Sequence, residues 1–422
     1  MSEFASYVEN LGESARVAAA GLVSASGRRR DDALRAIARK LRENRDALLA
    51  ANAKDIAAAE ASGLAGPMVE RLRLNEKRIE AMAASVDAIA GQVDPVGRTI
   101  EAFNRPDGLR IEKRRVPIGV VLFFYESRPN VTSDAAALCL KSGNAVILRG
   151  GKEAMHSNQA VAGMIAAALE ETGLPPAAVQ VVGLTDRAVV PLLLKADKHI
   201  DLVIPRGGES LIRAVVADAT MPVLKHFTGN CHLYLDASLD DYEAQAVAIC
   251  VNAKTSYPGG GVCNAVEHIL VHQSVAAELL PKVCDALAAK GVEVRGDDRT
   301  TAIWPAAKPT TDADWAEEYL AFVVGMKVVD SLDEAVAHIN RYGSHHTDGI
   351  VSTSLKAIEA FTTRVDSASV MVNASTRLAD GGEYLLGAEI GISTDKLHAR
   401  GPMGAADLTT YKWIVTGDGH LR

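Results

Sequence analysis

The sequence has few of the features that mark secreted, membrane-spanning or nucleic-acid-binding proteins. Its five cysteines are widely spaced and form no C-x-x-C pair, which argues against a disulfide framework and a zinc site. No apolar run approaches the roughly 20 residues that cross a bilayer, and the N-terminus lacks the layout of a signal peptide. A net charge of -8 argues against nucleic acid or an anionic membrane as the main partner. We therefore expect a cytoplasmic protein with reduced thiols and no metal.

The hydrophobic pattern of the chain predicts an α/β fold. The first ninety residues have helical periodicity, and short apolar runs then alternate with helix-like segments. The expected strands cover residues 117–126, 144–150, 179–184, 200–206, 231–236, 267–272, 292–295, 322–330, 347–353 and 369–373. This alternation predicts mainly parallel sheets covered by helices, in at least two domains. Residues 98–115 and 405–418 alternate like exposed β-ribbon.

Two glycine-containing loops follow predicted strands at the place where open α/β sheets bind ligands. One contains Arg149, Gly150 and Lys152, and the other contains Gly207 and Gly208. Glycines and a cation before a helix N-terminus suit a phosphate group. The sequence has no G-x-G-x-x-G fingerprint, however, so two tight turns with exposed basic side chains explain these loops equally well.

A run of three glycines at residues 259–261 precedes Cys263. Such a run costs backbone entropy and packs no side chain, but it lets the backbone approach a ligand closely. A thiol delivered in this way suits covalent catalysis, in which a thiolate attacks a carbonyl and nearby N–H groups bind the oxyanion. The alternative is that Cys263 is a small buried hydrophobic residue.

Four blocks of sequence resemble a known family. They are YESRPNVT at 125–132 with CLKSGNAVILRGG at 139–151, IPRGG at 204–208, AVAHIN at 335–340 with HHTDGI at 345–350, and VNASTR at 372–377 with KLHARGPMG at 396–404. Together they resemble the aldehyde dehydrogenase superfamily and, within it, the γ-glutamyl phosphate reductase family of proline biosynthesis. The resemblance covers nearly the whole chain.

The resemblance implies an aldehyde dehydrogenase-like fold with a variant Rossmann cofactor domain. The NADP-binding domain would comprise residues 1–97 and 117–232, and the catalytic domain residues 233–394. A β-ribbon of residues 98–116 and 405–422 would serve homo-oligomerisation.

The family reduces γ-glutamyl phosphate with NADPH to glutamate 5-semialdehyde (glutamate-5-semialdehyde dehydrogenase activity). The resemblance implies that Cys263 carries a thioester and that the Asn130 amide stabilises the oxyanion. The labile acyl phosphate makes a handover from an upstream glutamate kinase plausible.

The resemblance also assigns the binding residues. Those expected to bind NADP are Arg149, Gly150, Lys152, Gly207, Gly208 and Glu318. Those expected to bind substrate are Glu126, Arg128 and Arg377. Lys152 falls where NAD-preferring relatives place a glutamate, so a lysine there should favour the 2′-phosphate of NADP. Leu320 stands where an aromatic residue is common, which puts the contact of Glu318 with the cofactor in doubt.

Rival functions remain open. An aldehyde-oxidising NAD(P) dehydrogenase needs a glutamate upstream of the cysteine, and residues 225–231 contain no carboxylate. Glu267 lies close to Cys263 in sequence, but we expect it to be a local structural partner. A cysteine hydrolase would need a histidine base beside Cys263. A non-catalytic dinucleotide-binding protein would leave the glycine run unexplained.

Overall fold

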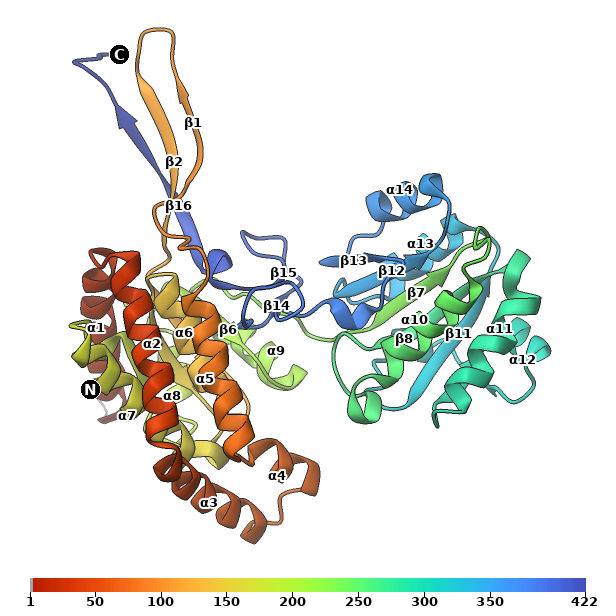
Figure 1. The fold of residues 1–422 in the computed structure, drawn as a ribbon, viewed down its shortest axis with the longest axis horizontal. Coiled ribbons are helices and arrows are strands. Elements are labelled where there is room, and N and C mark those ends of the chain that lie inside the picture. The colour runs from red at the N-terminus through yellow and green to blue at the C-terminus, as the bar shows by residue number, and fades with distance from the viewer. Residues whose placement is uncertain (1–2) are drawn as a thin grey trace.

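The structure, a computed structural model, describes residues 3–422 and contains two α/β units and a projecting β-ribbon (Figure 1). The first unit is built on a four-stranded parallel sheet with strand order β5-β4-β3-β6. Its strands are β3 (Val120–Phe124), β4 (Ala145–Arg149), β5 (Val179–Val181) and β6 (Leu202–Pro205). These strands agree with the predicted ones, and β3, β4 and β6 are almost entirely buried.

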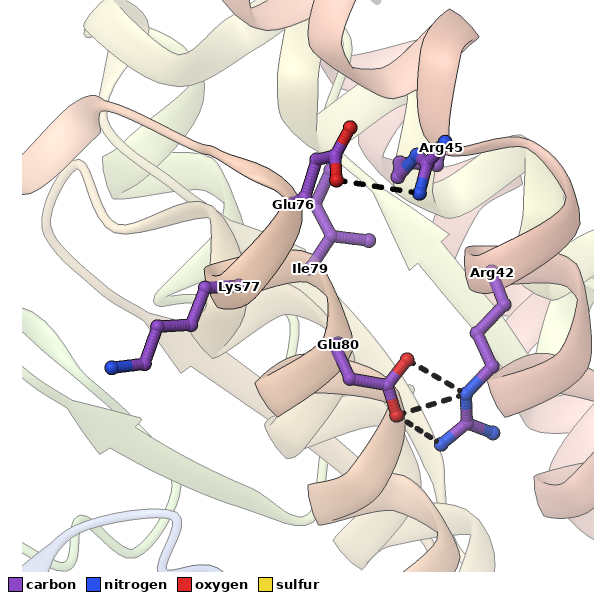
Figure 2. Close-up of a pocket in the computed structure, with 6 residues that line it drawn as sticks. All are labelled: Arg42, Arg45, Glu76, Lys77, Ile79 and Glu80. Atoms are coloured by element: carbon purple, nitrogen blue, oxygen red, sulfur yellow. Dashed lines mark hydrogen bonds and ion pairs between the residues drawn. The ribbon is translucent and has the colours of Figure 1, made fainter.

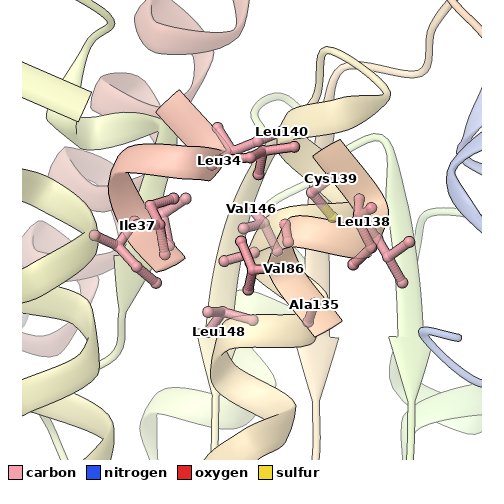
Figure 3. Close-up of a cluster of buried hydrophobic side chains, with 14 of the residues drawn as sticks. Leu34, Ile37, Val86, Ala135, Leu138, Cys139, Leu140, Val146 and Leu148 are labelled. Atoms are coloured by element: carbon pink, nitrogen blue, oxygen red, sulfur yellow. The ribbon is translucent and has the colours of Figure 1, made fainter. Parts of the chain in front are cut away.

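Helices surround this first sheet. They are α1 (Glu3–Val23), α2 (Gly27–Glu43), α3 (Arg45–Ala61), α4 (Gly66–Leu72), α5 (Glu76–Ala90), α6 (Pro129–Lys141), α7 (Met155–Glu171), α8 (Val189–Leu193) and α9 (Glu209–Asp218). Figure 3 shows Leu34 of α2, Val86 of α5, Leu138 of α6 and Val146 of β4 in one buried cluster. The apolar stripes predicted for the first ninety residues therefore form the core of this unit. No helix within residues 3–422 is both long and apolar enough to cross a membrane.

The second unit contains a seven-stranded parallel sheet with strand order β10-β9-β11-β8-β7-β12-β13. Its strands are β7 (Cys231–Leu235), β8 (Val266–His272), β9 (Glu293–Gly296), β10 (Lys308–Pro309), β11 (Val323–Val329), β12 (Thr347–Val351) and β13 (Ser369–Val372). Its helices are α10 (Glu243–Thr255), α11 (Gln273–Ala288), α12 (Asp298–Ile303), α13 (Leu332–Tyr342) and α14 (Leu355–Arg364). The parallel α/β architecture inferred from the sequence is confirmed.

A three-stranded antiparallel ribbon projects from the first unit (Figure 1). It consists of β1 (Thr99–Asn104), β2 (Arg110–Pro117) and β16 (Thr409–Thr416), in the order β1-β2-β16. Large apolar side chains on it are exposed, among them Phe103 and Trp413, each at 50%. A ribbon was predicted at both segments, and its exposed aromatic side chains are unusual for a surface that faces only water.

The packing differs from the predicted domain limits in two places. The limit between residues 232 and 233 lies inside β7, which pairs with β8 and β12 of the second sheet from Cys231 onward. The predicted catalytic domain also extends to residue 394, whereas Ile390 belongs to the hydrophobic core of the first unit, together with Met403 and Leu408. The chain returns to the first unit after β13 because these apolar side chains complete its core. The short pair β14 (Ile392–Ser393) and β15 (Gly401–Pro402) lies on this returning segment.

The second unit buries a group of histidines between its sheet and α13. The ring centroid of His232 lies 5.0 Å from that of His268 and 5.6 Å from that of His338. Burial lowers the pKa of His338 to about 3 and holds that of His268 well below its usual value. Both rings are therefore neutral at physiological pH.

Because these rings are neutral in the folded protein, we predict that the free energy of unfolding falls as the pH falls. Below pH about 6.5 these histidines bind protons in the unfolded chain, whereas the buried rings of the folded protein do not. Each ring's contribution to the free energy of unfolding is therefore complete above that pH. It is lost as the pH falls toward the folded value of about 3 for His338. Each such histidine contributes a slope of roughly 1.4 kcal/mol per pH unit. Urea unfolding midpoints measured from pH 6.5 downward should show a weaker pH dependence for His338→Gln than for the unmodified protein. Equal pH dependence in the two proteins would contradict this account.

Candidate functional site

The glycine run before Cys263 is required by its backbone conformation. Gly259 and Gly260 have φ angles of 73° and 70°, in the left-handed region that side chains other than glycine disfavour. A Cβ on Gly260 would also stand 2.8 Å from the carbonyl oxygen of Ala321. The run therefore gives Cys263 a tight loop between α10 and β8, and the Cys263 side chain is partly exposed.

The Cys263 loop packs directly against the chain segment that connects the two units. A Cβ on Gly229 would stand 1.9 Å from the carbonyl oxygen of Cys263, so only glycine fits. The thiol of Cys231 donates to the same oxygen at 3.1 Å. The N–H of Gly229 donates to Glu318 at 2.8 Å, and burial raises the pKa of this carboxyl. Glu318, predicted to bind the cofactor, therefore also fixes the segment that holds Cys263.

A buried ion pair supports the other side of the loop. Lys254 Nζ lies 2.7 Å from Glu267 Oε2, and both side chains are fully buried. Burial raises the pKa of Glu267 to about 7. Because Glu267 is engaged with Lys254, it is the local structural partner that the sequence led us to expect.

Two histidines lie beside the Cys263 thiol, and neither was predicted as a site residue. One ring nitrogen each from His226 and His346 lies within 4.8 Å of the other and of Cys263 Sγ. The Nδ1–H of His226 donates to the carbonyl of Ile392 at 2.8 Å, so Nε2 of a neutral ring carries a free lone pair. His346 is fully buried, burial lowers its pKa to about 4, and its Nε2 has no partner in the described part of the chain. A thiol with two imidazoles is also a donor set that Zn²⁺ accepts.

All the predicted cofactor residues except Glu318 lie at one edge of the first sheet. Because β4, β3 and β6 are parallel neighbours, their carboxyl ends bring Arg149, Lys152 and Gly208 to the same side. Gly208 precedes α9, and a Cβ there would meet no atom within 4 Å, which leaves the helix N-terminus open. Arg149 is half-buried, burial lowers its pKa, and its Nε has no partner in the residues described. Lys152 is exposed. An open helix N-terminus with nearby cations fits a phosphate-bearing cofactor.

Gly150 in the first of these loops is fixed by a close contact, and Gly207 in the second lies beside the side chain of Glu126. A Cβ on Gly150 would stand 2.4 Å from the Asn158 amide nitrogen. A Cβ on Gly207 would stand 3.4 Å from Cγ of Glu126. Glu126, predicted to bind substrate, therefore lies against the Gly207 loop.

Two of the other predicted site residues, Arg128 and Asn130, line a cavity of about 310 Å³. Arg128, Asn130 and Tyr257 line it, together with residues of α4 and α5. The Asn130 amide donates to Asp134 at 3.2 Å, and burial raises the pKa of Asp134 to about 6. Within residues 3–422, Asn130 shares no hydrogen bond with Cys263, so its oxyanion role remains a prediction.

Arg377 connects this cavity to the Cys263 loop. Its guanidinium lies 5.5 Å from the ring centroid of Tyr257 and donates to Oδ1 of Asn264, the residue after Cys263. The predicted substrate residues therefore occupy three places: the cavity, the Cys263 loop and the Gly207 loop.

A second cavity, of about 360 Å³, lies on the outer face of α2 and α5 (Figure 2). Two ion pairs join charged side chains that line it: Arg42 with Glu80 at 2.8 Å and Arg45 with Glu76 at 3.6 Å. None of the predicted site residues lines this cavity. Its paired charges indicate a structural role in joining the two helices.

Comparisons with known proteins show the family to which the chain belongs. Residues 4–313 match the model of the aldehyde dehydrogenase family. The chain is 55% identical over 380 residues to a γ-glutamyl phosphate reductase of Rhodopirellula baltica, covering 90% of this chain and 87% of that protein. It is 51% identical over 415 residues to the enzyme of the same name from Moorella thermoacetica, covering 98% of both chains.

A solved structure shares the fold closely. The crystal structure of γ-glutamyl phosphate reductase from Thermotoga maritima has a TM-score of 0.95 and 44% identity, covering 98% of this chain and 99% of that one. An acetylating aldehyde dehydrogenase from Geobacillus thermoglucosidasius, at 17% identity and a TM-score of 0.69, shares the fold. The chain therefore belongs to the aldehyde dehydrogenase family of NAD(P)-dependent oxidoreductases, in its γ-glutamyl phosphate reductase branch.

Proposed function

We propose that this protein reduces γ-glutamyl phosphate with NADPH to glutamate 5-semialdehyde and phosphate, through a thioester on Cys263. The observation that carries the proposal is the setting of Cys263. Its loop is fixed by Gly229, and within residues 3–422 the groups clustered with its thiol are the imidazoles of His226 and His346. A carboxylate base there would activate water and hydrolyse the thioester. Its absence from this cluster favours an enzyme that keeps the thioester for transfer.

The chemistry follows from the residues at the site. The Cys263 thiolate attacks the acyl carbon, the C–O bond to phosphate breaks, and phosphate leaves with its electron pair. Bound NADPH supplies the hydride that reduces the thioester. The resulting thiohemiacetal oxyanion then collapses. Its C–S bond breaks, the aldehyde leaves, and the Cys263 thiolate is regenerated. The Asn130 amide and the Cys263 N–H are the donors that we assign to the oxyanion.

We assign the cofactor site to the carboxyl edge of the first sheet. The open N-terminus of α9 at Gly208 and the unpaired Nε of Arg149 fit a phosphate-bearing ligand. The exposed Lys152 would meet the 2′-phosphate that distinguishes NADP from NAD. Glu318 would meet the nicotinamide ribose.

We also propose an oligomeric state, a cellular location and an upstream partner for the protein. The exposed apolar side chains of the β-ribbon, such as Phe103 and Trp413, support a homo-oligomer that covers them. A cytoplasmic location and delivery of the acyl phosphate by an upstream glutamate kinase accord with the reduced thiols and the lability of the substrate.

A cysteine hydrolase is the alternative function for which the structure offers a candidate base, because His226 and His346 lie beside Cys263. Such an enzyme would need no dinucleotide. The aldehyde-oxidising dehydrogenase differs instead in the acyl acceptor, which would be water.

The reverse reaction separates these functions. With glutamate 5-semialdehyde and NADP, we expect formation of reduced coenzyme to depend on added phosphate, since phosphate must release the acyl group. Cys263→Ala should abolish turnover, whereas Cys284→Ala, which changes a buried thiol in α11, should retain it. Absorbance of the reduced coenzyme is the measurement. Turnover without phosphate would establish the oxidising dehydrogenase, and hydrolysis without coenzyme would establish the hydrolase.

Coenzyme choice tests the role of Lys152. Lys152→Glu replaces the cation with a charge that repels the 2′-phosphate, so KM for NADP should rise about ten- to a hundredfold. KM for NAD should not rise. Lys290→Glu, an exposed lysine of the second unit, is the matched control. An unchanged ratio of the two KM values in Lys152→Glu would remove this residue from the cofactor site.

A further inference from the structure

The cavity of about 310 Å³ has walls from four parts of the chain. Leu74 and Met82, from the α4–α5 region, and Pro129, at the start of α6, give it apolar surface. Tyr257 closes it from the Cys263 loop. The cavity therefore spans the two units and adjoins the nucleophile's loop.

Four arginines line this cavity, and only two of them have partners. Arg73 and Arg78 both pair with Glu70, at 3.5 and 2.8 Å. The side chains of Arg71 and Arg128 have no ion pair and no hydrogen bond within residues 3–422. Two positive charges therefore line the cavity without an ion-pair partner.

The environment of the Arg128 side chain favours an anionic ligand. Its half-buried guanidinium has a pKa lowered first by burial and then by repulsion from Arg206 and Arg71, which together outweigh the attraction of Tyr257 and Glu126. Asp134 is the one acidic side chain among the lining residues, and it already accepts a hydrogen bond from Asn130. A partly buried charge without an ion-pair partner is costly, and an anionic ligand would offset that cost. The adjacent N-terminus of α6 adds its dipole in the same sense.

We infer that Arg71 and Arg128 bind the α-carboxylate of the substrate's glutamyl group in this cavity. The inference rests on the proposed function and names the residues that select its substrate. Paired guanidinium donors match a carboxylate, and Leu74 and Met82 supply apolar surface for the methylene groups. Arg377, predicted as the second anion clamp, is already engaged with Asn264, and Arg71 takes its place.

The carboxylate suits this cavity better than the phosphate does. The phosphate is bonded to the carbon that Cys263 attacks, so it must lie beside the thiol. Cys263 does not line the cavity, although Tyr257 of its loop does. The end of the substrate that reaches the two arginines is therefore the end remote from the reacting carbon, which carries the α-carboxylate.

The test uses Arg71→Gln in the phosphate-dependent reverse assay. KM for glutamate 5-semialdehyde should rise about ten- to a hundredfold, the loss expected for a charge-assisted hydrogen-bonded contact. KM for phosphate should stay unchanged, as should turnover of butanal, an aldehyde without a carboxylate. Arg73→Gln is the matched control, because this arginine lines the same cavity but is paired with Glu70, and it should leave all three values unchanged. Arg71→Lys keeps the charge without the paired donors and should show a smaller rise.

The outcomes are distinct. A rise in KM for phosphate in Arg71→Gln would place the phosphate at the arginines and overturn the assignment, as would unchanged KM values in a folded variant. An equal rise in Arg73→Gln would overturn it too, because the effect would then be general to the cavity. If the unmodified protein shows no phosphate-dependent turnover, the proposed function itself fails, whatever Arg71→Gln does.

Discussion

The close contact between Gly229 and the Cys263 backbone is the constraint on which the site depends. A Cβ on Gly229 would stand 1.9 Å from the Cys263 carbonyl oxygen, so the two segments fit together only because Gly229 lacks one. The segment that carries Gly229 passes from the first unit to β7, and the Cys231 thiol hydrogen-bonds the same oxygen. The position of the nucleophile is thus tied to the connection between the two units. A rigid placement of this kind is what covalent catalysis requires.

Charges around the site are divided between structural and functional roles. Lys254 and Glu267 compensate each other in full burial and hold the loop. Arg71 and Arg128 have no ion-pair partner within residues 3–422 and line a cavity. The contrast separates side chains that the fold uses from those left free for a ligand. Paired charges therefore stabilise the fold at this site, and we propose that the unpaired ones bind an anionic group of the substrate.

The sequence predicted most of the architecture because its signals are local. Buried strands such as β3 and β4 have continuous apolar runs. The positive φ angles of Gly259 and Gly260 explain the glycine run that precedes Cys263. Helix α10 was not predicted, since its apolar residues form no stripe along the sequence EAQAVAICVNAKT. The end of the predicted catalytic domain was misplaced because Ile390 returns to the core of the first unit.

The site itself was only partly predictable. Cys263 and the glycine loops have sequence signatures, whereas His226 and Arg71 become site residues only through folding. His226 lies 37 positions before Cys263 and reaches it because the chain between the units doubles back on the Cys263 loop. Arg71 resembles any surface arginine in the sequence, and only its lack of an acidic partner beside Arg128 distinguishes it from Arg73.

The central claim is that Cys263 holds an acyl group that water does not remove but phosphate does. Mass spectrometry of the protein after incubation with glutamate 5-semialdehyde and NADP, without phosphate, tests it most directly. The account predicts a glutamyl adduct on the peptide that contains Cys263, stable in buffer and released when phosphate is added. An adduct on another residue, or loss of the Cys263 adduct at the same rate with and without phosphate, would contradict it.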